Sequence, residues 1–363
     1  MKPDCILVTA LTDPGIMRSL NLKQWDLLIR QARNANLSGR LNTLCHENGL
    51  LEHIPEQAIN HLSSAQILAD RQVDTIRWEV NRIQQALERL DVPVVLLKGA
   101  AYLLSGLPAA KGRIFTDIDL LFRKKEIDAV EKTLLLFGWF PTKMDEYDQR
   151  YYRTWMHEIP PLSHIKRLSV LDVHHAILPE TASLHPDTEK LLENIIPVKG
   201  FDNLFTLSEV DMVLHSATHL FHDGELENGL RDLIDLDALL RHFSENNPDF
   251  WNDIVLRAHD LELSRPLYYA FKYSNKLLNT PIPKNILTSL DQSPIKPLAW
   301  FMDRLFSRAL QPDHASCDDG FTGIARWLLY VRSHYLRMPF QLLLPHLLRK
   351  AWMRRFNEQD TTI

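Results

Sequence analysis

The chain has 363 residues, 45% of them hydrophobic, and a formal net charge of -5 from 41 basic and 46 acidic side chains. This length and apolar content exclude a largely disordered chain and predict two or three compact units. The near balance of charge gives no overall attraction to nucleic acid, whose binders usually carry a basic excess.

The cysteines and the apolar runs indicate the cellular compartment of the protein. Cys5, Cys45 and Cys317 are widely spaced and odd in number, so they predict neither a disulfide framework nor a CxxC metal site. The apolar run 5–11 is too short and wrongly flanked for a secretory signal. No apolar run approaches the ~20 residues that span a bilayer. We therefore expect a cytoplasmic protein without a transmembrane segment.

Residues 1–90 are expected to form an N-terminal helical region. Between residues 69 and 90, apolar side chains recur at three- and four-residue steps and would form one stripe on a helix. These side chains are Val73, Ile76, Val80, Ile83, Leu87 and Leu90. The pattern breaks at Asp91 and Pro93. The apolar run that follows ends at Lys98 and Gly99, which predicts a buried strand and a tight turn.

Residues 91–179 are expected to form a small α/β core. TDIDLLF, residues 116–122, predicts a second strand, and a charged helical stretch follows from Lys124. LSVLDVHHAI, residues 168–177, predicts a third strand, which ends before Pro179. Residues 180–363 are expected to form a C-terminal helical region. Its helical segments are 207–222, 229–243, 250–261, 266–278 and 300–310.

Three carboxylates point to metal chemistry. Asp117 and Asp119 are two positions apart, and on a strand this spacing puts both side chains on one face. Hard oxygen ligands of this kind favour Mg²⁺, which keeps waters and substrate phosphates in its shell. Asp172, on the third expected strand, offers a third carboxylate, and His174 would lie on the same face as Asp172. Such a site could hold a nucleoside triphosphate.

Residues upstream of the carboxylates suit phosphate binding. Gly99 lets the backbone approach a phosphate where a helix begins, and Lys98 and Arg113 could neutralise its charge. Each motif alone is also typical of an ordinary surface: a solvated strand end, an exposed lysine, a turn glycine. Their order along the chain is what favours the functional interpretation.

The same motifs resemble a known family. The run LLKGAAYLLSGLPAAKGRIFTDIDLLF, residues 96–122, resembles the signature of the uncharacterised nucleotidyltransferase family of the polymerase-β superfamily. That family combines an LKG turn with an R-x-x-x-D-I-D-L-L segment. LDVHHAIL, residues 171–178, resembles its third-carboxylate strand, and RDLIDLDALL, residues 231–240, its helical C-terminal segment. The resemblance covers about residues 92–240.

The resemblance implies a nucleotidyltransferase α/β core with a small mixed sheet, flanked by N- and C-terminal helical regions. It implies transfer of a nucleoside monophosphate from an NTP to a hydroxyl group of an unidentified small-molecule or protein acceptor, with Mg²⁺ in a two-metal site. The expected catalytic and metal-binding residues are Asp117, Asp119 and Asp172, and the expected nucleotide-binding residues are Lys98, Gly99, Arg113 and His174.

An alternative is a catalytically inactive accessory or binding protein with the same fold. In the wider superfamily the turn is Gly-Ser or Gly-Gly and lies closer to the two aspartates, whereas here Lys98-Gly99-Ala100 stands seventeen positions before Asp117. The accessory protein would use a basic C-terminal tail, because residues 320–357 contain no acidic side chain. The basic residues of this tail are Arg326, Arg332, Arg337, Arg349, Lys350, Arg354 and Arg355. The same segment also fits a helical pair packed on the core.

Three further features remain open at the level of sequence. His215, His219 and His222 would share one face of a helix, where they suit the lining of a cleft, a buried core or, lacking the glutamate of HExxH, a metal site. Arg231 and Asp235 are four apart and are expected to form a helical charge pair. The segment RTWMHE, residues 153–158, could add charged groups to the substrate side.

Overall fold

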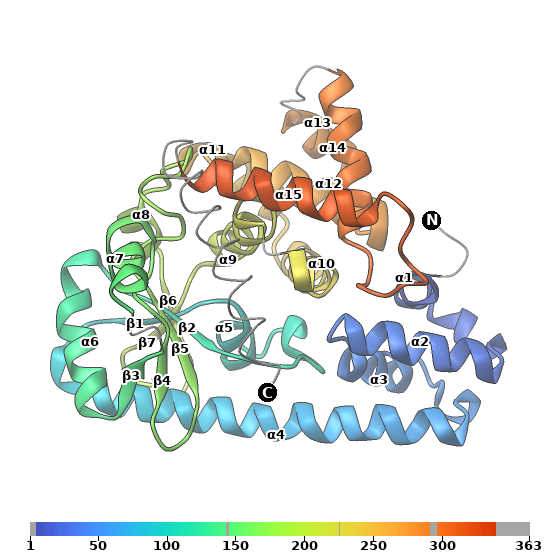
Figure 1. Ribbon diagram of the computed structural model, residues 1–363, viewed down its shortest axis with the longest axis horizontal. Coiled ribbons are helices and arrows are strands. Elements are labelled where there is room, and N and C mark those ends of the chain that lie inside the picture. The colour runs from blue at the N-terminus through green and yellow to red at the C-terminus, as the bar shows by residue number, and fades with distance from the viewer. Residues whose placement is uncertain (1–4, 143–144, 225, 291–295, 339–363) are drawn as a thin grey trace, which may run out of the picture.

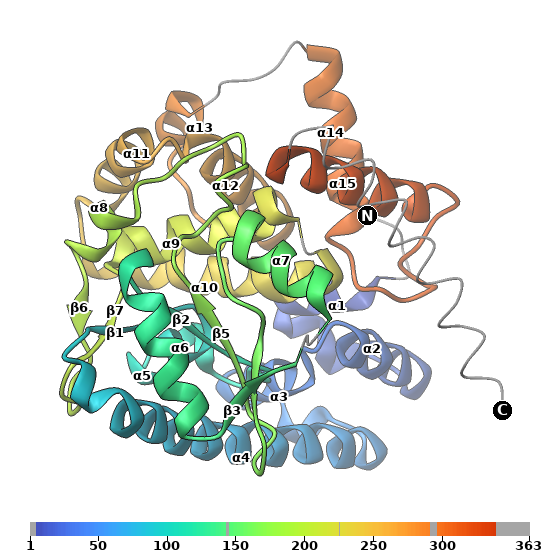
Figure 2. The same ribbon diagram turned by 60° about the vertical axis from the view of Figure 1, so that its left-hand side comes forward.

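The computed structural model of the chain describes residues 5–142, 145–224, 226–290 and 296–338. Its longest helix, α4 (Glu56–Leu87), runs along one side of the molecule (Figure 1). A mixed sheet lies over one end of α4 and the N-terminal helices lie over the other. The helices that follow the last strand of the sheet are on the far side of the sheet and of the N-terminal helices from α4, as both views show (Figure 2).

The N-terminal region is helical, as the periodicity predicts. Its first helices are α1 (Ile6–Thr12), α2 (Leu22–Asn34) and α3 (Ser38–Glu47). A capping box begins α2, because the Asn21 side chain accepts from the Gln24 N–H at 3.0 Å and the Gln24 side chain accepts from the Asn21 N–H at 2.9 Å. On α4, four members of the expected stripe are buried: Ile76, Val80, Ile83 and Leu87.

The sheet has seven strands in the order β3-β4-β5-β2-β1-β7-β6. They are β1 (Val94–Leu96), β2 (Ile118–Leu121), β3 (Trp139–Pro141), β4 (Leu162–His164), β5 (Val170–His174), β6 (Ile196–Pro197) and β7 (Leu204–Thr206). The three strands expected from the sequence, β1, β2 and β5, are neighbours at its centre. The sheet is mixed, because β2 is parallel to β5 and antiparallel to β1. The strands β3, β4, β6 and β7 extend it on both sides.

The helices that follow the sheet strands include the C-terminal segments expected from the sequence. Those between strands are α5 (Lys98–Leu104), α6 (Ile127–Leu136), α7 (Glu146–Trp155) and α8 (Thr188–Leu192). After β7 come α9 (Glu209–Thr218), α10 (Gly229–Asn246), α11 (Phe250–Asp260), α12 (Ser264–Leu278), α13 (Lys284–Ser289), α14 (Lys296–Ala309) and α15 (Thr322–Arg337). None of the helices in the described part of the chain is long and apolar enough to cross a membrane.

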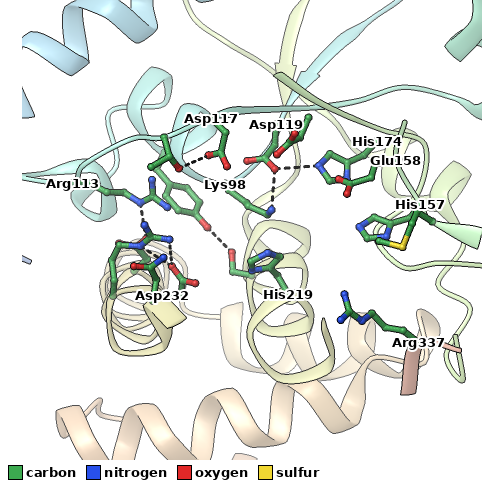
Figure 3. A pocket seen from close by; sticks show the side chains of 18 residues that line it. Lys98, Arg113, Asp117, Asp119, His157, Glu158, His174, His219, Asp232 and Arg337 are labelled. Atoms are coloured by element: carbon green, nitrogen blue, oxygen red, sulfur yellow. Dashed lines mark hydrogen bonds and ion pairs between the residues drawn. The ribbon is translucent and has the colours of Figure 1, made fainter. Parts of the chain in front are cut away.

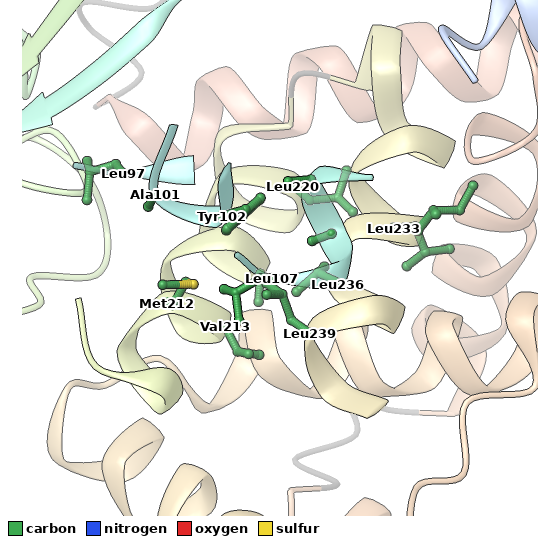
Figure 4. Packing of buried hydrophobic residues seen from close by; sticks show 14 of the residues in the cluster. Leu97, Ala101, Tyr102, Leu107, Met212, Val213, Leu220, Leu233, Leu236 and Leu239 are labelled. Carbon is green, nitrogen blue, oxygen red and sulfur yellow. The ribbon is translucent and has the colours of Figure 1, made fainter. Parts of the chain in front are cut away.

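The sheet and the C-terminal helices are joined through α5. This short helix follows β1 directly, and its buried side chains pack against α9 and α10 (Figure 4). The Tyr102 hydroxyl lies 2.5 Å from Ser216 Oγ on α9, so a hydrogen bond reinforces the apolar contact. One hydrophobic cluster runs through all three expected regions, from Cys5 to Leu329. The N-terminal and C-terminal regions are also in contact, because the buried Sγ atoms of Cys5 and Cys317 lie 2.8 Å apart.

Candidate active site

Two neighbouring strands bring the three predicted carboxylates to one cavity. Asp119 on β2 is paired in register with Asp172 on β5, so their side chains lie on the same face of the sheet. Asp117 stands one residue before β2 begins. All three line a cavity of about 190 Å³, together with Lys98, Arg113 and His174. The structure therefore brings together these six residues, which the sequence analysis named separately.

Asp119 is the buried centre of the cluster and is only 3% exposed. Its Oδ1 accepts from Lys98 Nζ at 2.9 Å and from His174 Nε2 at 3.1 Å (Figure 3). Lys98 begins α5 with a φ of 45°, a left-handed conformation that a lysine rarely adopts. The backbone strain at Lys98 accompanies a side chain that reaches the carboxylates, a combination typical of functional sites.

The charged groups in the cavity shift one another's pKa values. Burial alone would raise the pKa of Asp119, but the ammonium of Lys98 and the hydrogen bond from His174 hold that pKa well below its usual range. Burial and the neighbouring Asp119 raise the pKa of Asp117. Burial would lower the pKa of Lys98, yet Asp119 raises it. Asp119 and Lys98 therefore form an ion pair in the described structure, and a further cation near Asp117 would oppose the rise in the pKa of that carboxyl.

Arg113 lines the same cavity but is held from the helical side. Its Nε donates to Asp235 Oδ2 on α10 at 2.8 Å, and Arg40 Nη2 lies 3.6 Å from Asp235 Oδ1. The guanidinium of Arg113 occupies the space that a side chain at Gly99 would need. Gly99 is therefore required here for the close approach of Arg113, in addition to any approach of a phosphate.

The donor atoms of the three aspartates suit Mg²⁺. Carboxylate oxygens are its usual protein ligands, and both contacts of Asp119 use Oδ1, so Oδ2 faces no partner among the contacts described above. The carboxylates do not converge as tightly as an occupied site would require. Among the described residues, ligand atoms from three residues lie within 4.8 Å of one another at a different point, formed by His157, Glu158 and His174.

A larger cavity of about 890 Å³ adjoins the first one. The two share lining residues from the segment before β4, from the turns between α9 and α10, from α10 and from the end of α15: Met156, Glu158, His219, Asn228, Arg231, Asp232 and Arg337. Tyr151 and Tyr152 of α7 and Arg326 and Tyr330 of α15 line only the larger cavity. The carboxylates thus stand beside a second space that is large enough for another substrate.

Comparison with protein families shows to which family the chain belongs. The family described as "Uncharacterised nucleotidyltransferase" matches residues 21–279. The chain belongs to the uncharacterised nucleotidyltransferase family. The matched range holds the whole sheet and each of the predicted site residues, whereas α13, α14 and α15 follow it. Comparisons with curated proteins and with solved structures give no match to this chain.

Three histidines have separate positions in this nucleotidyltransferase: His215 lies on α9, and His219 and His222 lie on the π-helical turn that follows it. His219 lines both cavities, as the cleft interpretation predicts, whereas His215 is buried and only 4% exposed. His222 is buried, and its Nε2 lies 3.4 Å from Ser183 Oγ. Within the described ranges these three histidines do not form a group of metal ligands. Burial lowers the pKa of His215 to about 3 and that of His222 to about 4.

Charged residues of the C-terminal region also have partners other than those expected from the sequence. Arg231 does not pair with Asp235, because its Nη2 lies 2.8 Å from Asp232 Oδ1 and Asp235 faces Arg113 instead. In α15, Arg326 pairs with Asp313 at 2.7 Å and Arg332 donates to the Phe221 carbonyl at 2.8 Å. Arg349, Lys350, Arg354 and Arg355 of the basic tail lie outside the described residues.

Sequence reasoning did not assign His157 or Glu158, although it noted the segment 153–158. Their backbone pairs with β5 through the isolated bridge between Glu158 and His174. The only signal in the sequence was a histidine next to a glutamate at a turn, a pattern too common to assign a role. The partner, His174, lies on a strand distant in the sequence, so periodicity could not reveal the cluster.

Proposed function

We propose that this chain is a Mg²⁺-dependent nucleotidyltransferase that moves a nucleoside monophosphate from an NTP to a hydroxyl group of an acceptor. The observation that carries the proposal is that Asp119 and Asp172, from two paired strands, and Asp117, just before the first of these strands, line one cavity beside Lys98. Membership of a nucleotidyltransferase family supports it. Oxygen ligands from adjacent strands are what a metal–triphosphate complex requires.

The chemistry follows from the groups at the cavity. Bound Mg²⁺ would neutralise triphosphate charge and stabilise the charge that develops at the α-phosphate. The acceptor oxygen attacks the α-phosphorus, the bond to the pyrophosphate oxygen breaks, and Asp172 takes the acceptor proton. Lys98 leaves Asp119 for phosphate oxygens, which exchanges one ion pair for another. Pyrophosphate then departs.

The acceptor is expected to enter from the larger cavity. This space adjoins the carboxylates and is lined by three tyrosines, Tyr151, Tyr152 and Tyr330, and by Arg326. Arg231 and Arg337 line it too, and they also line the nucleotide cavity. Aromatic rings with arginines suit an acceptor that has both an apolar surface and hydrogen-bonding groups. These three tyrosines do not line the nucleotide cavity, in which charged residues and histidines predominate.

The test is binding of each of the four ribonucleoside triphosphates by calorimetry, with and without Mg²⁺. We expect one NTP to bind in a Mg²⁺-dependent manner, and the double variant Asp117→Asn, Asp119→Asn to weaken binding by about 100-fold or more. The matched control is Asp128→Asn on α6, which changes an exposed aspartate and is expected to leave binding unchanged.

The outcome that refutes the proposal is equally defined. If the folded wild type binds no NTP, or if the double variant binds as tightly as the wild type, the carboxylates do not form a nucleotide site. The accessory-protein alternative would then gain support from two contacts already described. Lys98 is paired with Asp119, and Arg113 is paired with Asp235.

A further inference from the structure

The backbone fixes a second cluster of ligating side chains beside the carboxylates. The segment that precedes β4 lies against β5, where the His175 N–H donates to the His157 carbonyl at 2.8 Å and the Ile159 N–H donates to the Val173 carbonyl at 3.0 Å. These bonds flank the bridge between Glu158 and His174. The side chains of His157, Glu158 and His174 are therefore presented by paired backbone and not by a loose loop.

The ligand atoms of this cluster converge. One atom each from His157, Glu158 and His174 lies within 4.8 Å of the other two. The two imidazole rings are stacked, with centroids 5.2 Å apart, and Figure 3 shows them with Glu158 at one end of the cavity. His157 is only 7% exposed, and its Nδ1 is buried with no hydrogen-bond partner within the described ranges. A buried ring nitrogen without a partner is costly unless a ligand satisfies it.

The contacts of His174 also indicate that a ligand binds at this cluster. Asp119 can only accept, so the hydrogen bond places the ring hydrogen of His174 on Nε2. In the neutral imidazole the other nitrogen, Nδ1, then carries a lone pair, and it lies 3.4 Å from Glu158 Oε2. Two acceptors that face each other repel. A cation between them turns this repulsion into coordination, and Asp119 then orients the ligating histidine, as carboxylates do in many metal sites.

We propose that His157, Glu158 and His174 bind a divalent transition-metal ion of the zinc class, at a position separate from the Mg²⁺ and nucleotide carboxylates. Two imidazoles and one carboxylate are the donor set of catalytic zinc centres and of other sites with an open coordination position. Imidazole nitrogen favours such ions over Mg²⁺, which prefers oxygen donors. The site does not depend on the proposed transferase activity.

The position of the cluster suggests what the ion would contact. Glu158 lines both cavities, whereas His157 and His174 line only the nucleotide cavity. An ion held by the three residues would stand where the two cavities meet, with its open coordination position available to water or to a group of the acceptor. Because Asp119 holds His174, removal of the ion would also loosen one of the groups that position Asp119.

The test uses the full chain after removal of metals by a chelator. Co²⁺ is titrated in and followed by its visible absorption, and Zn²⁺ is then added in competition. We expect one tightly bound ion per chain, displaced by Zn²⁺, and an affinity at least about 100-fold weaker in His157→Gln and in Glu158→Gln. Two variants are used so that one remains informative if the other does not fold, and thermal unfolding checks both.

Two controls separate this site from the nucleotide site. His222→Gln removes another buried histidine and is expected to keep Co²⁺ affinity, and Asp117→Asn is expected to keep it while losing Mg²⁺-dependent NTP binding. The proposal is overturned if the folded wild type binds no Co²⁺ or if both cluster variants bind it as the wild type does. It is also overturned if Asp117→Asn abolishes Co²⁺ binding, because the ion would then occupy the nucleotide carboxylates.

Discussion

Acid sensitivity of folding is expected to depend on His215. Burial and the charge of Lys98 lower the pKa of this histidine from 6.5 to about 3. The unfolded chain therefore binds a proton at His215 between these two values while the folded chain does not, so the free energy of unfolding falls as the pH falls through this window. A pH of about 5 is some 1.5 units below the pKa of His215 in the unfolded chain. The free energy of unfolding is therefore expected to be about 2 kcal/mol lower at pH 5 than at pH 7.

The assay is urea denaturation of the wild type and of His215→Gln at both pH values. Glutamine does not titrate, so the variant is expected to lose about 2 kcal/mol less than the wild type between the two conditions, whatever its stability at pH 7. His46→Gln, a change at an exposed histidine, is the control and should keep the wild-type difference. Equal losses in the wild type and His215→Gln would refute the assigned role of burial at His215.

Two buried ion pairs give further predictions, each measured by urea denaturation at neutral pH. Glu79→Ala removes the carboxylate that accepts from Arg167 Nε and Nη2, both at 2.8 Å. The free energy of unfolding should fall by about 3 kcal/mol. A loss below about 1 kcal/mol would show that solvent screens the pair. Asp235→Asn leaves the buried guanidinium of Arg113 without its carboxylate and should also cost about 3 kcal/mol. Wild-type stability in that variant would show that another group compensates Arg113.

The sequence predicts the centre of the sheet and the long helices well, for a physical reason. The strands β1 and β2 are buried along their whole length, β5 alternates half-buried and buried residues over its first four positions, and α4 and α10 have long apolar stripes. The strands β3 and β4, at one side of the sheet, have only three residues each, too few for alternation to stand out. Their pairing is decided by tertiary contacts, which local patterns do not encode.

The candidate site was predictable where its residues share a strand and not where they meet across the fold. The spacing of Asp117 and Asp119 fixes their common face, and the alternation on β5 puts His174 on the face of Asp172, which agrees with the cavity lining. The pairing of Arg113 with Asp235 joins a loop to a helix far along the chain. The periodicity of the sequence does not predict such a contact. Arg231, which is four residues from Asp235, was expected to be its partner instead.

The long sequence separations in the site have a consequence for folding. The hydrogen bond between His174 and Asp119 joins residues 55 positions apart, and the bond between Arg113 and Asp235 joins residues 122 positions apart. Closing such loops costs entropy before the contacts form, so the complete site is expected to assemble late, when sheet and C-terminal helices have already docked. A ligand that requires the whole site would therefore slow unfolding by holding together segments that no local element joins.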